Sequence, residues 1–355
     1  MATTAKKQQK SARIDIVDFW RFFAAIMIVL FHMPCIGGAN ITVAFFVEFF
    51  FMLTGFFIFK HFQKPPFVSA TSEQKAKNAI QYTWKRFKSL LPYTIPIVII
   101  CTPVVAYSYY AQAHYQPYAI GMLKRIFIEP FLLPSQLEYD GFRTIGPLWY
   151  LSVMIFFMPI ICYIAQTKKI NIFVMCMIPI CWLYLSCFGL IYSQGINSPL
   201  VCVRGLVAML LGGVIFYLVE IIKEKKISNL KRIFFTVAEI ALYLLAAFIR
   251  FYYSKPHYVA IVMLFLALVI TLSGFSYTSK IKNKLFNFLG AISLPLFMWH
   301  YGIISVLQYH TSYGITRRYV IVFGLSIALS IIHYAIVQKI ASARAAKRAK
   351  LKAWA

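Results

Sequence analysis

Long apolar stretches separated by shorter polar segments run along nearly the whole chain, and this pattern predicts membrane-spanning helices. A helix needs roughly 20 predominantly apolar residues to cross a bilayer. Stretches of this kind lie at about 15–36, 41–61, 89–112, 147–166, 170–192, 200–222, 233–253, 257–277, 286–308 and 318–338. They are too long and too continuously apolar for the alternating strands of a membrane β-barrel. We therefore predict an all-α polytopic membrane protein with about ten transmembrane helices.

The composition excludes a soluble enzyme, a disordered chain and a disulfide scaffold. Hydrophobic residues make up 61% of the 355 residues and charged residues only 13%, whereas soluble domains average about 45–50% and about 25%. The seven cysteines all fall in apolar stretches, and no two of them form a Cys-x-x-Cys pair. We therefore expect small buried hydrophobic side chains there, with no metal cofactor and no disulfide framework.

The formal net charge of +26 is large enough to suggest nucleic acid as a partner, but the placement of the charges argues for another origin. If the N-terminus is cytoplasmic, most of the 36 Lys and Arg residues fall in segments that face the cytoplasm. We predict cytoplasmic N- and C-termini, a multi-pass protein of the cell (inner or plasma) membrane and no nucleic-acid partner. The predicted parts are a basic tail at 1–14, a membrane domain at 15–338 and a basic tail at 339–355. The first span is expected to stay uncleaved.

Ionisable residues inside the predicted spans are functional candidates, because each costs several kcal/mol in a bilayer unless it is paired or faces a cavity. They are Arg21, His32, Glu48, Arg204, Glu239, His300 and His333, with Asp18 at the mouth of the first span. The longest predicted outer connection, at about 113–146, is a further candidate for function or for a lid. It contains Glu129, Glu138 and Asp140.

Arg21 and His32 lie on one face of the first predicted helix. In an α-helix, the rotation from Arg21 to His32 is within about 20° of three whole turns. The two residues are then about 16 Å apart along the helix axis. That face presents a fixed cation near the cytoplasmic end and a titratable base near the outer end, which suits group transfer across the membrane. The alternative is that Arg21 snorkels to the interface and that His32 makes a structural hydrogen bond.

Two carboxylates in the first two spans need partners. Asp18 precedes Arg21 by three residues and is within reach of an ion pair. Alternatively Asp18 complements the helix dipole, with Asp15 as the N-cap. Glu48 stands among phenylalanines, where an imidazole partner would offset its burial. His32 flanks the same outer turn, so a pair of Glu48 and His32 is sterically reasonable.

Five segments resemble the integral-membrane acyltransferase 3 family, in the family's order. The first is the Asp-x-x-Arg-x10-His pattern that runs from Asp18 to His32. The others are VEFFFMLTGF at 47–56, GPLWYLS at 146–152, Arg204-Gly205 followed by Gly212-Gly213, and FLGAIS at 288–293 followed by His300. The resemblance covers nearly the whole chain and implies a membrane acyltransferase, here without the esterase-like domain that some members append.

The chain departs from the family pattern at two places. The family often has an Arg-x-x-Arg pair in the first cytoplasmic loop, whereas here Arg86 is followed by Ser89 at the second position. The neighbouring Lys88 keeps the segment basic but does not supply the fork of a second guanidinium. Many members also carry acidic residues after the Leu-Trp-x-Leu-Ser segment, where this chain has Val153 and Met154.

The resemblance implies transfer of an acyl group, usually acetyl, from cytoplasmic acyl-CoA to a hydroxyl of an envelope glycan or lipid-linked saccharide. His32 would act as the general base, with Glu48 as its orienting partner. Arg21, Arg204 or a backbone group would stabilise the thioester oxygen. The expected donor is acetyl-CoA, and the expected partners are the glycan acceptor and membrane lipids. Three basic residues would bind the phosphates of CoA, unless they reflect only the positive-inside bias: Arg86, Lys85 and Lys88.

Three further residues enter through the family pattern. Trp149 and Ser152 lie near the outer end of the fourth predicted span, although a tryptophan there is also typical of the interfacial belt. His300 falls in the middle of the ninth span and matches the family's histidine. Glu239 and His333 match nothing in the family and are interpreted as structural.

Two other classes of function are alternatives. A polytopic transporter or flippase for a small polar substrate or glycan intermediate would place charges at the midplane and often shows inverted repeats. We find no internal repeat, and the charges of the first span lie towards its two ends. A nonenzymatic partner of a glycan synthase would leave the alignment of Arg21 with His32 unexplained.

Overall fold

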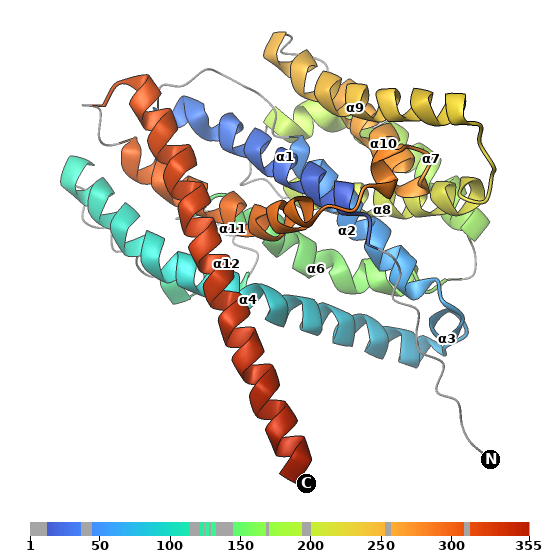
Figure 1. The fold of residues 1–355 in the computed structure, drawn as a ribbon, viewed down its shortest axis with the longest axis horizontal. Helices are drawn as coiled ribbons and strands as arrows, with labels where there is room; N and C mark the ends of the chain where they lie inside the picture. The colour runs from blue at the N-terminus through green and yellow to red at the C-terminus, as the bar shows by residue number, and fades with distance from the viewer. Residues whose placement is uncertain are drawn as a thin grey trace.

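A computed structural model describes residues 13–354, except 37–44, 114–120, 122, 124, 128, 133–144, 168–169, 194–199, 253–256 and 309–312. The described residues form helices and connections without a strand (Figure 1). The α-helices are α1 (Asp15–His32), α2 (Phe46–Phe62), α3 (Pro65–Val68), α4 (Ser72–Ala113), α6 (Leu148–Ile164), α7 (Ile170–Ser193), α8 (Leu200–Ile222), α9 (Asn229–Tyr252), α10 (His257–Ser273), α11 (Lys284–Leu307) and α12 (Ile315–Trp354). Short 3-10 helices are η1 (Met33–Ile36), η2 (Arg125–Phe127), η3 (Glu129–Phe131) and η5 (Thr278–Lys280).

The prediction of an all-α fold is confirmed for the described residues, and several of the helices are candidate membrane spans. Five helices are long and apolar enough to cross a membrane, namely α4, α8, α9, α11 and α12. Shorter apolar helices lie at Leu148–Ile164, Ile172–Tyr184 and Tyr258–Ser273. The count of about ten spans and the cytoplasmic position of both termini stay predictions.

Two segments predicted as polar connections or tails are helical instead. The third predicted span starts at 89, yet α4 begins at Ser72 and runs without a break for 42 residues. Thr71 and Gln74 form a capping box, in which each side chain accepts the other's backbone N–H. Likewise α12 continues through the basic segment after 338 to Trp354. Alanine and lysine favour a helix in water as well as in lipid, so a hydropathy window locates the apolar part of these helices and not their ends.

Asp15 has a different role from the predicted N-cap. Helix α1 follows Ile14, which makes no side-chain cap. The Asp15 carboxylate instead accepts hydrogen bonds from the backbone N–H of Asn283, at 2.9 Å, and from Nδ2 of Asn287, at 3.2 Å. It thereby joins the start of α1 to the start of α11, so that the two helices run side by side in the same direction.

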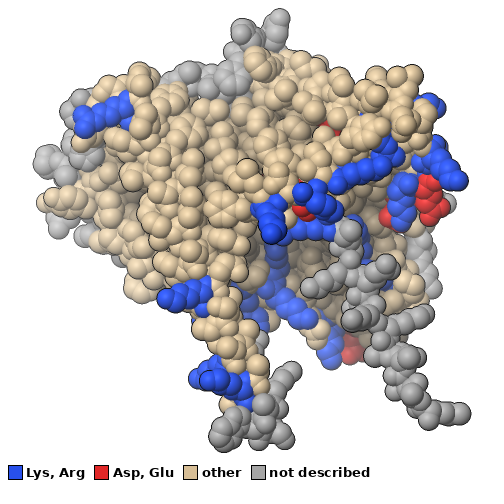
Figure 2. Space-filling view, in the orientation of Figure 1, with Lys and Arg blue, Asp and Glu red and all other residues tan. Residues whose placement is uncertain are grey.

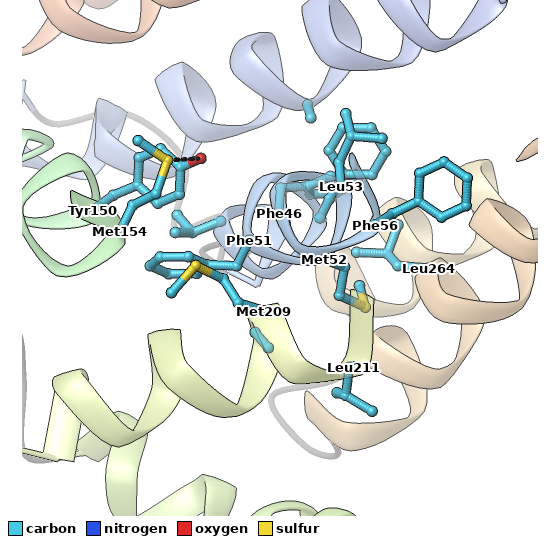
Figure 3. Close-up of a cluster of buried hydrophobic side chains, with 14 of the residues drawn as sticks. Phe46, Phe51, Met52, Leu53, Phe56, Tyr150, Met154, Met209, Leu211 and Leu264 are labelled. Atoms are coloured by element: carbon cyan, nitrogen blue, oxygen red, sulfur yellow. Dashed lines mark hydrogen bonds between the residues drawn. The ribbon is translucent and has the colours of Figure 1, made fainter. Parts of the chain in front are cut away.

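Helix α2 forms the centre of the bundle and packs most closely on α8. A Cβ atom added at Gly55 would overlap the backbone oxygen of Met209, and one added at Gly212 would overlap that of Met52. Small residues allow this close approach of two helices. Around the contact, large apolar side chains of α2 interdigitate with those of α6, α8 and α10 (Figure 3).

Most of the described Lys and Arg side chains gather towards one end of the molecule, while a smaller basic group lies on the opposite side, at the upper left of Figure 2. Figure 2 shows the larger group over the N-terminal ends of α1, α4 and α9 and along the C-terminal part of α12. The broad face between this end and the opposite one is covered by uncharged residues. This is the distribution that the predicted cytoplasmic segments require.

Candidate active site

A central cavity of about 310 Å³ lies among α1, α2, α4, α6 and α11. Its polar side chains are Arg21, Thr54, Tyr82, Arg86, Tyr150 and Ser293. The rest of the wall is apolar and comes largely from Phe, Leu and Met side chains. A cavity with two guanidinium groups and an apolar interior suits an anionic ligand with an apolar arm.

Arg21 is held by an ion pair with Asp18, which is one of the two roles that the sequence leaves open for this carboxylate. Its Nη1 donates to Oδ1 of Asp18 at 3.1 Å, while Oδ2 of Asp18 accepts from Nε of Arg13 at 2.6 Å. A Cβ atom at Gly290 of α11 would overlap the Asp18 carboxylate. The absence of a side chain at Gly290 therefore makes room for the group that positions Arg21.

The structure brings His32 and His300 together. Nε2 of His300 lies 3.1 Å from Nδ1 of His32. Nδ1 of His32 also lies 2.9 Å from the carbonyl oxygen of Ile28, and Nδ1 of His300 lies 3.2 Å from that of Leu296. Because a carbonyl oxygen only accepts, the neutral rings carry their protons on Nδ1. His32 then donates to Nε2 of His300, and the lone pair of His32 is on its Nε2.

Phe297 connects this histidine pair with the central cavity. Its side chain lines the cavity, and its ring centroid lies 6.2 Å from that of His300. Phe50 and Tyr150 also line the cavity, with ring centroids 6.1 and 5.8 Å from Phe297. The two histidines do not line the cavity themselves, and the aromatic cluster lies between the histidine pair and the cavity that Arg21 lines.

Glu48 does not pair with His32, in contrast to the prediction. Nη2 of Arg204 donates to Oε2 of Glu48 at 2.8 Å, and Nε of Arg204 donates to Oε1. Both side chains are buried, and the guanidinium lies 5.2 Å from the centre of the Trp149 ring. Arg204 is outside the wall of the central cavity. The two buried charges that the sequence left without partners therefore compensate each other between α2 and α8.

A comparison with protein families decides the class of the protein. A model of an acyltransferase domain, that of the acyltransferase 3 family, matches residues 14–335. The chain belongs to the acyltransferase 3 family. It is therefore a membrane acyltransferase, and the match gives no support to the transporter alternative. No curated protein and no solved structure gives a significant match to the chain.

Of the remaining residues predicted for this acyltransferase, Arg86 lines the cavity and the others do not. Trp149 and Ser152 are both buried in α6, at 6% and 3% exposure, so Trp149 is not an interfacial belt residue. Lys85 and Lys88 are exposed on α4, and Nζ of Lys88 lies 5.3 Å from the centre of the Trp84 ring. Of the three basic residues predicted to bind CoA phosphates, Arg86 lines the central cavity and the two lysines do not.

Glu239 and His333, which the sequence analysis interprets as structural, each have hydrogen-bond partners within the protein. Oε1 of Glu239 accepts from Nε1 of Trp20 at 3.0 Å, and Oε2 accepts from the Thr278 hydroxyl at 2.5 Å. His333 bonds to Nε1 of Trp299 at 3.2 Å. Of the outer segment proposed as a lid, Glu138 and Asp140 lie outside the described residues, and Glu129 is buried in η3.

Four polar cavity residues were not singled out from the sequence. Tyr82 precedes Arg86 by one helical turn on α4, a spacing that places both on one face. Tyr150, Thr54 and Ser293 lie inside the family-like segments, but nothing in an apolar run tells which of its residues face a cavity. In the described part of the chain, no cluster of three or more His, Cys, Asp or Glu side chains is arranged to hold a metal ion.

Proposed function

We propose that the protein transfers an acyl group, normally acetyl, from cytoplasmic acyl-CoA to a hydroxyl of a cell-envelope glycan or lipid-linked saccharide. The observation that carries the proposal is the histidine pair. His32 has Nε2 available as a proton acceptor, while its Nδ1–H is engaged by the backbone and by His300. A hydroxyl needs such a base because it is a poor nucleophile at neutral pH.

The cation-bearing end of the cavity suits the phosphates of the donor. Arg21 and Arg86 reach it from two helices, and guanidinium groups bind phosphate through charge-assisted hydrogen bonds. The position of Arg21 within α1 places it about 16 Å from His32 along the helix. The pantetheine arm of CoA is comparable in length, so phosphates at Arg21 and a thioester near His32 are compatible. Arg21 is then a phosphate ligand rather than the group that stabilises the thioester oxygen.

The chemical step follows from this arrangement. The acceptor hydroxyl gives its proton to Nε2 of His32 as its oxygen attacks the thioester carbonyl. The ester C–O bond forms, the C–S bond breaks, and the proton passes to the departing thiolate of CoA. While His32 is positively charged, its Nδ1–H donates to Nε2 of His300, and a hydrogen bond from a charged donor is the stronger kind. His300 is therefore a positioning residue.

Two measurements test this function. Mass spectrometry of surface glycans should detect acyl esters in a complemented deletion strain and lose them in strains carrying His32→Ala or Arg21→Ala. The purified protein in vesicles should release CoA thiol from acetyl-CoA only when the glycan acceptor is present. Lys85→Ala, an exposed change one residue from Arg86, is the matched control and should behave as wild type. Normal glycan esters in the His32→Ala strain, or solute flux without thiol release, would overturn the proposal.

A further inference from the structure

A second and larger cavity lies outside the active site, as a groove between α4, α11 and α12. Its volume is about 790 Å³, and Trp299 of α11 contributes to its wall while the next residue, His300, faces His32. In Figure 1, α12 crosses α4, and its C-terminal part points away from the bundle. Most of the groove wall is apolar, with Ile100, Ile332 and Ile336 each about half exposed.

Two cations line the groove in addition to this apolar wall. Lys88 comes from α4 and Arg344 from α12, and both side chains are exposed. Lys88 belongs to the N-terminal half of α4 and Arg344 to the C-terminal part of α12, and these parts lie towards the basic end of the molecule, which is the cytoplasmic end in the predicted topology. An apolar groove with cations at one end has the charge pattern that complements an anionic headgroup followed by a hydrocarbon chain.

The polar groups in the groove wall are paired with one another. In a helix, the carbonyl of Pro92 would accept from the N–H of residue 96, but Pro96 has none. Nε2 of His333 lies 2.9 Å from this carbonyl oxygen and must donate to it, since an oxygen of this kind only accepts. Nδ1 of His333 then accepts from Nε1 of Trp299 at 3.2 Å. Backbone groups that face hydrocarbon have to be satisfied by protein in this way, so the wall suits an acyl chain better than a polar substrate.

The groove is long enough for such a chain. A neighbouring cavity of about 220 Å³ shares Ile100, Trp299 and Leu329 with it and reaches Val104. From Lys88 to Val104, α4 rises about 24 Å. The hydrocarbon part of one leaflet is about half of the roughly 30 Å core. The two cavities together therefore extend over the depth of a leaflet.

We propose that this groove binds an anionic phospholipid of the cytoplasmic leaflet. The phosphate lies at Lys88 and Arg344, and one acyl chain follows the groove past His333 towards Trp299. This site is separate from the acyl-transfer site and does not depend on the proposed chemistry. Lys88 is thereby assigned to a lipid phosphate and not to the phosphates of CoA.

The full-length protein in phosphatidylcholine nanodiscs, supplied with a phosphatidylglycerol whose acyl chain carries a photoactivatable group, tests the site. Labelled peptides should map to the groove-lining parts of α4 and α12. Lys88→Gln and Arg344→Gln should each lower labelling there about fivefold, because a basic residue at an anionic lipid surface is worth about that factor. Lys347→Gln and Lys350→Gln remove exposed charges of the same helix that do not line the groove, and should change labelling little.

A second variant tests the acyl-chain part of the site separately. Ile336→Trp should fill the groove and abolish labelling while both cations remain. Retention of the thermal transition by the two glutamine variants, which alter exposed side chains, shows that they fold. The proposal is overturned if Lys88→Gln and Arg344→Gln label like wild type, or if Ile336→Trp does. It is also overturned if photoactivatable phosphatidylcholine labels the groove as well as phosphatidylglycerol does.

Discussion

His300 and His32 share a hydrogen bond of 3.1 Å, although the two residues come from opposite ends of the chain. The pairing follows from the way α1 and α11 run side by side, with Asp15 fixing their starts to one another. Each ring is also bound to a carbonyl of its own helix one turn earlier. Backbone geometry therefore determines which nitrogen of each ring carries the proton. This is how an apolar helix can present one defined imidazole nitrogen to a substrate.

Replacing His300 should slow the reaction without preventing donor binding. His300→Ala removes one of the two acceptors of the His32 Nδ1–H and leaves the Ile28 carbonyl, so the imidazole loses part of its fixed orientation. We expect kcat to fall about 10²-fold, at the lower end of what a positioned general base contributes, while KM for acetyl-CoA stays close to wild type. Steady-state thiol release measures both constants.

A conservative change at His300 separates positioning from packing. His300→Gln keeps an acceptor oxygen and should recover part of the lost kcat, whereas His300→Leu keeps the volume alone and should not. Equal activity of the glutamine and leucine variants would contradict the role assigned to the hydrogen bond.

Glu48 should matter for stability more than for the chemical step. Glu48→Gln leaves the buried guanidinium of Arg204 without its counter-charge, and breaking a buried pair of this kind costs about 3–5 kcal/mol. Thermal unfolding of the purified protein should therefore shift strongly downward. The double variant Glu48→Leu with Arg204→Met removes both charges and should recover much of the loss. If the single variant unfolds like wild type but loses kcat, the pair of Glu48 and Arg204 serves the chemical step and not stability.

The sequence was sufficient to predict the class of fold, because long apolar runs and the bias of basic residues are properties of local composition. It also marked His32 and Arg21, since a charge within an apolar run stands out, whereas Arg86 entered only through the resemblance to the family's basic segment. The predicted start of α4 and the predicted end of α12 were wrong, because both helices extend into polar sequence that is itself helix-forming. A hydropathy window detects the apolar part of a helix that matches the thickness of the bilayer, and it does not detect polar turns that extend the same helix.

The partners of the buried charges could not be predicted in the same way. Glu48 and His32 are near in sequence, and proximity suggested a pair, but Glu48 lies on the α2 face that packs against α8. The glycines at this contact bring α8 close enough for Arg204 to reach it. Which helix faces which is a property of the whole bundle. In a single sequence, small residues such as Gly55 and Gly212 indicate that two helices can approach closely, but they do not tell which helix is the partner.

Gly290 should be essential for the position of Arg21. In Gly290→Ala the new Cβ atom overlaps the Asp18 carboxylate, so the ion pair with Arg21 has to move. We expect KM for acetyl-CoA to rise several-fold, with a smaller effect on kcat. Gly324→Ala is the matched control, because a Cβ atom there meets nothing within 4 Å. A KM for Gly290→Ala that equals that of the control would show that Asp18 does not position Arg21 for the donor.

Arg86 should contribute to donor binding through charge, and this can be tested on the ligand as well as on the protein. Arg86→Gln removes one of the two guanidinium groups of the cavity, and a hydrogen bond to a charged group is worth about 1.5–3 kcal/mol. KM for acetyl-CoA should rise about tenfold or more, while Lys85→Gln stays near wild type. Acetyl-pantetheine lacks the nucleotide phosphates and should be used equally well by wild type and Arg86→Gln. If the variant is impaired by the same factor with both donors, Arg86 supports the fold of the cavity instead of binding phosphate.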